Sequence, residues 1–149
     1  MIVRIAAALV LSIIWSSAHA IEQTNRPEQY ICVANKLSGF EYKDDTKMWG
    51  PVHSRSDRKY LVAPVSERDV KFQVTEVGKN APLGFCKGGF NDSGHLFCDV
   101  IGGEFKINKT NGRFLLSYLA GYYDVGSTPE ITDETSDMPF LEIGKCSRF

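Results

Sequence analysis

The sequence predicts a small all-β domain, either an antiparallel barrel or a sandwich of about eight short strands held by two disulfides. Three observations lead to this fold class: short runs of alternating apolar and polar residues, turn-forming residues between those runs, and four cysteines behind an export leader. Apolar residues do not recur with helical spacing over any long window. Many short strands with close turns are typical of small barrels and sandwiches.

The first 20 residues have the three parts of a secretory signal peptide. A single positive charge at Arg4 precedes an apolar stretch from Ile5 to Trp15, and the small residues Ala18 and Ala20 follow. A transmembrane anchor is the alternative, but spanning needs roughly 17–25 residues and this stretch is shorter. We therefore predict cleavage after Ala20, a single disulfide-linked β domain over 21–149, and a periplasmic or secreted location.

Charge argues against a nucleic-acid partner, and hydropathy argues against a membrane span in the mature chain. The chain has 17 basic and 18 acidic residues, a net charge of −1, and removing the leader takes away one basic residue and no acidic one. A nucleic-acid-binding domain is usually strongly basic, so no nucleic-acid partner is expected. No second apolar stretch approaches membrane-spanning length, so no membrane span is expected in the mature chain.

The strand predictions rest on period-two alternation. The clearest run is 70–75, where Val70, Phe72 and Val74 share one face and the intervening polar residues share the other. Further runs occur, in chain order, at 29–35, 59–63, 83–87, 95–101, 104–108, 113–118 and 140–143.

Turn chemistry separates these runs. Segments 78–82, 91–94, 102–103 and 109–112 supply glycine, asparagine or proline, which tolerate positive φ or pre-set a turn. Asn111-Gly112 between two strand patterns is a strong hairpin signal. Residues 70–118 are therefore predicted to form a meander of five strands. The alternative is a mix of strands and helices, with a short helical turn in 40–58 or around 118–123.

The four cysteines predict two disulfides, because an even number of thiols in an exported chain of this size usually pairs. Cys86 and Cys98 flank the 91–94 turn almost symmetrically, which would bring them together in a hairpin. Cys32 and Cys146 lie in the first and last strand patterns, and their bond would join the two ends. Of the three possible connectivities we favour Cys86–Cys98 with Cys32–Cys146. No Cys-x-x-Cys spacing is present, so no metal site is predicted.

No catalytic motif stands out. Residues 21–149 contain two histidines, His53 and His95, and no Gly-x-Ser-x-Gly elbow or Ser-x-x-Lys sequence. A cysteine nucleophile is disfavoured because all four thiols can pair. The sequence therefore predicts no catalytic residues, no cofactor and no enzymatic activity.

A long acidic loop is the first candidate binding segment. No lysine or arginine lies between Arg113 and Lys145, and the stretch 124–137 has no strand pattern. Structureless loops of about 12 residues or more are usually functional or disordered. An acidic loop attracts cationic partners, although it can also serve solubility alone. The candidate partner-binding residues are Asp124, Glu130, Asp133, Glu134 and Asp137.

The stretch 40–60 is the second candidate, because aromatic and basic residues alternate there. Such a mixture can stack on and neutralise nucleic acids or sugar acids. We prefer the interpretation that Phe40, Trp49 and Tyr60 plug one end of a barrel while the charges face water.

These observations predict an exported, non-enzymatic binding protein, for instance a periplasmic inhibitor or interaction module for a cationic secreted protein such as a lysozyme. One alternative is a carrier with a small apolar ligand inside the barrel. Another is a hydrolase whose site does not show in the sequence. The oligomeric state is not predicted.

Overall fold

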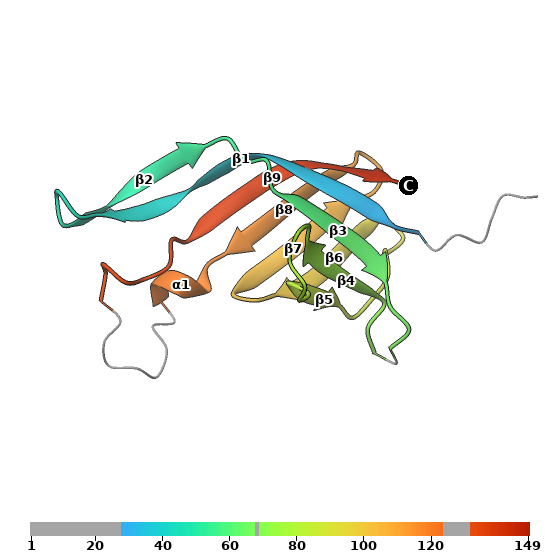
Figure 1. Cartoon of the computed structure of the whole chain (residues 1–149). Helices are drawn as coiled ribbons and strands as arrows, with labels where there is room; N and C mark the ends of the chain where they lie inside the picture. Colours follow the sequence, from blue (N-terminus) through green and yellow to red (C-terminus); the bar gives the residue numbers. More distant parts are fainter. Residues whose placement is uncertain (1–27, 68, 124–131) are drawn as a thin grey trace, which may run out of the picture.

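The computed structural model describes residues 28–67, 69–123 and 132–149, and it confirms an all-β fold with two disulfides (Figure 1). The predicted signal peptide with its cleavage after Ala20, and the candidate residues Asp124 and Glu130, lie outside the described residues. The strands are β1 (Tyr30–Lys43), β2 (Met48–Ser54), β3 (Lys59–Pro64), β4 (Phe72–Glu76), β5 (Gly84–Cys86), β6 (His95–Val100), β7 (Gly103–Asn108), β8 (Arg113–Tyr118) and β9 (Phe140–Arg148), and a four-residue helix α1 (Ala120–Tyr123) follows β8.

The strands form a closed antiparallel barrel of eight strands with one additional strand. The hydrogen-bonded order is β1-β3-β4-β5-β6-β7-β8-β9, and β9 pairs back with β1. Closure leaves these eight strands without a free edge. The ninth strand, β2, pairs with the second half of β1 and lies outside this ring.

The predicted five-strand meander over 70–118 is confirmed as β4 to β8, each paired with the next. Asn111-Gly112 forms the turn between β7 and β8. Gly112 has a φ of 63°, a conformation that glycine adopts without strain. The Oδ1 atom of Asn111 accepts a hydrogen bond from the backbone N–H of Arg113, at 2.9 Å, which closes the turn.

Of the two positions offered for a helical turn in the alternative interpretation, 40–58 does not hold one. This stretch contains no helical turn among its residues; it continues β1 to Lys43 and then forms β2. Gly50 and Pro51 interrupt the alternation that would have marked β2. Proline is tolerated because β2 is an edge strand, where a missing N–H costs no ladder bond. The other suggested position is confirmed, since α1 occupies 120–123.

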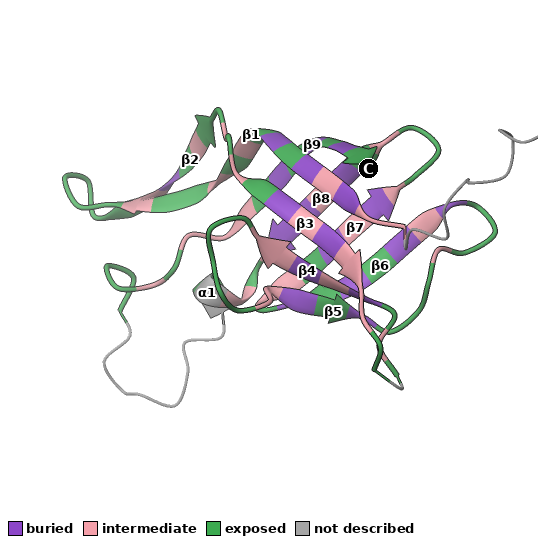
Figure 2. Cartoon of the chain, turned by 45° about the vertical axis from the view of Figure 1, so that its right-hand side comes forward, coloured by how far each residue is buried: buried purple, intermediate pink, exposed green. Residues whose placement is uncertain are grey.

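Alternating side chains from all eight barrel strands fill the interior. Buried residues alternate with intermediate or exposed ones along β3, β6 and β9 (Figure 2). The centre holds three aromatic rings. The ring centroid of Tyr60 lies 5.5 Å from that of Phe105 and 5.8 Å from that of Phe114, and the rings of Phe105 and Phe114 stack with centroids 5.1 Å apart. Side chains therefore occupy the middle of the barrel.

Both predicted disulfides are confirmed. Cys32–Cys146 joins β1 to β9, directly opposite each other where the barrel closes. Cys86–Cys98 joins β5 to β6 and continues their register. Within the described ranges, no helix has the length and apolar character needed to cross a membrane.

Candidate functional site

A β-hairpin formed by β1 and β2 extends beyond the barrel (Figure 1). The last pair between β1 and β9 is Gly39 with Phe140, whereas β1 continues to pair with β2 as far as Lys43. Phe40, Tyr42 and Trp49 share one face of this hairpin, because Tyr42 lies opposite Trp49 and two residues from Phe40. This placement differs from the expected barrel plug. Tyr60 is buried in the core, but Phe40 and Trp49 lie on the projecting hairpin.

The described part of the acidic segment, residues 132–137, contacts this hairpin. Lys47 Nζ donates to Glu134 Oε1 at 2.6 Å, and Trp49 Nε1 donates to Asp133 Oδ1 at 3.1 Å. Asp137 accepts a hydrogen bond from Tyr118 Oη at 2.8 Å, at the end of β8. The structure thus brings together the acidic segment and the aromatic stretch, which the sequence offered as two separate candidates.

Aromatic contacts complete this surface. Trp49 packs edge-on against Tyr42, with ring centroids 6.0 Å apart, and against Tyr122 of α1 at 5.1 Å. Phe40 and Tyr122 remain exposed. We define the acidic–aromatic surface by six residues: Phe40, Tyr42, Trp49, Tyr122, Asp133 and Glu134.

The Glu134 carboxylate of this surface forms an exposed ion pair with Lys47. The hydrogen bond to Glu134 raises the pKa of Lys47, so this lysine stays charged beside the acidic segment. Both members of the pair are exposed, and water screens exposed ion pairs so that they stabilise little. The Lys47–Glu134 pair therefore adds little to the stability of the fold.

Behind the hairpin, a buried carboxylate ties the β2–β3 connection to β9. Glu142 is fully buried and accepts hydrogen bonds from Tyr60 Oη, Ser56 Oγ and Arg58 Nε, the last at 2.9 Å. Burial, followed by the hydrogen bond to Glu142, raises the pKa of Tyr60, so its phenol remains protonated and donates. Arg58 also lies 4.7 Å above the Phe140 ring. All three donors bind one carboxylate, so Glu142 fixes the β2–β3 connection, where the hairpin leaves the barrel, to β9.

The histidines and cysteines make local contacts. His53 Nδ1 lies 2.8 Å from Ser38 Oγ, and His95 Nε2 lies 3.1 Å from Asn108 Nδ2. All four cysteines are in the two disulfides. In the part of the chain that the structure describes, no three His, Cys, Asp or Glu side chains are placed to hold a metal ion.

Comparisons of the chain with protein-family models, with curated proteins and with solved structures found no match. The functional argument therefore starts from the surfaces of this molecule. Of the predicted partner-binding residues, Asp133, Glu134 and Asp137 are exposed and lie beside the hairpin or the end of β8.

Proposed function

We propose that this chain is an exported, non-enzymatic binding protein whose acidic–aromatic surface holds a cationic protein. One observation carries the proposal: an acidic segment is held against a projecting hairpin that presents tryptophan, tyrosine and phenylalanine side chains. Aromatic residues are enriched at the centres of protein interfaces, where they contribute much of the binding energy. Carboxylates around them steer a basic partner into the right orientation.

Packing of the barrel supports binding on its outside. Tyr60, Phe105 and Phe114 occupy the centre, where a carrier would need space for its ligand. The hairpin instead places side chains away from the barrel, where a partner surface can reach them. A secreted basic enzyme such as a lysozyme is the first partner to test, and the chain would then act as its inhibitor or docking module.

Reversing the acidic segment tests the proposal. We expect the D133K/E134K/D137K variant to associate with lysozyme at least about tenfold more slowly than the unmodified protein at low salt, because electrostatic steering accelerates association by roughly 10–10³-fold. The difference should shrink as salt approaches physiological strength, where charges more than about 8 Å apart are screened. Stopped-flow fluorescence on protein purified after export gives the association rate constant.

A matched control separates the local surface from the overall charge. The variant E67K/D69K/D92K reverses three exposed carboxylates that form no ion pair or hydrogen bond with other described side chains and lie outside the acidic–aromatic surface. It should reduce the rate much less, and both variants should keep their melting temperature. Equal rates for the two variants would mean that the acidic segment serves solubility alone.

A further inference from the structure

Two adjacent hollows lie on the outside of the barrel, and their charge is opposite in sign to that of the acidic–aromatic surface. They have volumes of about 670 and 660 Å³, and Lys36 and Ile143 line both. Phe97, Leu141 and Ile143 are 55%, 47% and 46% exposed there. Exposed apolar side chains that lie together inside a polar rim can form an interaction site.

Strand register explains how these residues meet. Phe97 on β6 lies opposite Lys106 on β7, which lies opposite Leu115 on β8, and Leu115 lies opposite Ile143 on β9. Ile143 in turn lies opposite Lys36 on β1. Neighbouring strands are about 4.8 Å apart, so this row spans roughly 19 Å across five strands.

The charged side chains that line the two hollows are all positive among the described residues. The cations lining the two hollows are Lys36, Arg55, Lys106, Arg113 and Lys145, and no aspartate or glutamate lines them among the described residues. Lys106 pairs with Glu104, which lies outside the hollows, at 2.7 Å, and Lys145 Nζ donates to the carbonyl of Asn111 at 3.0 Å. The side chains of Lys36, Arg55 and Arg113 have no ion pair or hydrogen bond with another described residue.

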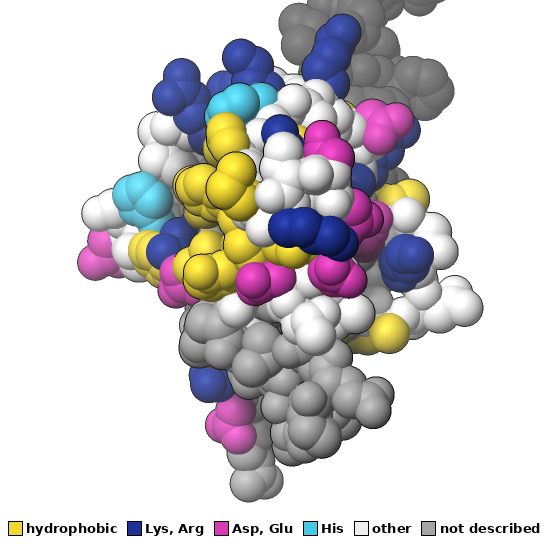
Figure 3. Space-filling view, turned by 90° about the vertical axis from the view of Figure 1, so that its left-hand side faces the viewer, with side chains coloured by type: hydrophobic (Ala, Val, Ile, Leu, Met, Phe, Trp, Pro, Cys, Tyr) yellow, Lys and Arg dark blue, Asp and Glu magenta, His cyan; other side chains and the backbone are white. Residues whose placement is uncertain are grey.

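Figure 3 shows one face of the molecule, on which apolar side chains gather near the histidine side chains with both basic and acidic side chains around them. We call the lining of the two hollows the apolar–cationic face. The chain as a whole has a net charge of −1, so the positive charge of this face is local and does not reflect an overall excess of basic residues.

We propose that the apolar–cationic face docks an acidic amphipathic segment of a partner protein, with carboxylates spaced between apolar side chains. Because the surface is concave there, it is complementary in shape to a convex peptide segment and not to a flat bilayer surface. Cations spread over β7, β8, β9, β1 and the residue that follows β2 match several separated carboxylates better than a single anionic head group. Apolar side chains of the segment would cover Phe97, Leu115 and Ile143, and the carboxylates would pair with the rim.

A defined peptide tests this proposal by fluorescence anisotropy on protein purified after export. The probe is a synthetic helical peptide of leucine and glutamate, compared with the same peptide carrying glutamine for glutamate. We expect the acidic peptide to bind at least about tenfold tighter at low salt, a difference of about 1.4 kcal/mol, and to lose that advantage as salt rises.

Charge-reversal variants locate the binding. K36E/R113E/K145E should weaken acidic-peptide binding about tenfold or more, and I143S should weaken it without changing the salt dependence. K59E/K71E/K79E reverses three exposed lysines outside this face and should weaken binding much less. Circular dichroism checks that each variant folds.

Four outcomes would overturn the proposal. Acidic and neutral peptides could bind equally, or the two triple variants could weaken binding equally. Anionic vesicles of phosphatidylcholine with phosphatidylglycerol could bind through the same cations while the peptide does not, which would make the occupant a lipid surface. Light scattering could show a dimer that K36E/R113E/K145E dissociates, which would make the occupant a second copy of this chain.

Discussion

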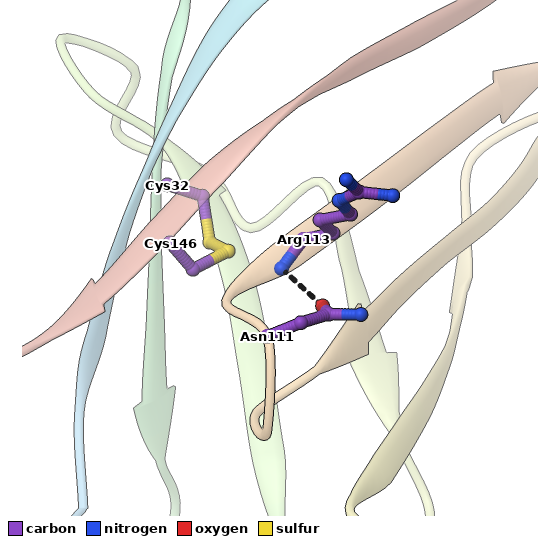
Figure 4. The surroundings of a disulfide bond; sticks show 4 residues. All are labelled: Cys32, Asn111, Arg113 and Cys146. Carbon is purple, nitrogen blue, oxygen red and sulfur yellow. Dashed lines mark hydrogen bonds between the residues drawn. A yellow bond between two sulfur atoms is a disulfide. The ribbon is translucent and has the colours of Figure 1, made fainter.

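Replacing both Cys32 and Cys146 with alanine will lower the free energy of unfolding by about 2–5 kcal/mol, the usual range for a native disulfide in a small secreted domain. The bond spans a sequence separation of 114 residues and joins β1 to β9 where the barrel closes. Figure 4 shows it beside the β7–β8 turn at Asn111 and the start of β8 at Arg113. In the chain-entropy model a loop of about 100 residues contributes about 4.7 kcal/mol, because the open chain gains so many conformations.

The second disulfide provides the matched control. Cys86–Cys98 spans a separation of only 12 residues, and a loop of about 15 residues contributes about 3 kcal/mol in the same model. Denaturant unfolding of C32A/C146A and C86A/C98A should therefore rank the long bond as the more stabilising. The opposite ranking would show that local packing of β5 and β6, rather than closure of the barrel ends, dominates the contribution of these bonds.

Replacing Glu142 with alanine will lower the free energy of unfolding by about 3 kcal/mol. Removing one member of a buried ion pair typically costs about 3–5 kcal/mol, because the remaining charge is left uncompensated. The lower end applies here, since the Arg58 side chain is 32% exposed and keeps some contact with water. Tyr60 and Ser56 would also lose their acceptor.

Urea unfolding of E142A, E142Q and E104A measures this effect. Glutamine still offers one carbonyl oxygen, so E142Q should fall between E142A and the unmodified protein. Glu104 lies on the outer side of β7 and is exposed, so E104A should change stability by less than about 0.5 kcal/mol. If E142A is no less stable than E104A, the carboxylate is not the anchor of the β2–β3 connection.

Local patterns predicted the barrel strands well where alternation is uninterrupted. The run 113–118 matches β8 at both ends, and the cysteine spacing predicted both bonds. Period two reports which side chains share a face, and turn residues report where a strand ends, so neither needs tertiary information. The β1–β2 hairpin was missed because Gly50 and Pro51 break the alternation.

Glu142 shows where hydrophobicity fails to predict which side chains of a strand face the core. In the run 140–143 the apolar residues Leu141 and Ile143 face outward, while Glu142 faces the core. The signal was present, because Cys146 must point inward to reach Cys32 and period two then turns Glu142 inward as well. Hydrophobicity alone suggests the opposite orientation.

The candidate binding surface depends on contacts distant in sequence. Lys47 and Trp49 meet Glu134 and Asp133 across separations of 87 and 84 residues. The acidic composition of 124–137 was evident from the sequence, but its position against the hairpin follows from the closure of the barrel by β9. The apolar–cationic face was not predicted, because its row crosses five strands and contributes one or two residues from each.

Chemical-shift mapping tests the central claim, that this protein binds a cationic protein through its acidic–aromatic surface. The ¹⁵N-labelled protein with both disulfides formed is titrated with unlabelled lysozyme at low salt, and backbone amide shifts are followed. We predict perturbations concentrated in hairpin residues 40–49, Tyr122 and residues 132–137, with the barrel amides around Phe105 unchanged. No perturbation at saturating lysozyme, or perturbations centred on Phe97, Leu115 and Ile143 instead, would contradict it.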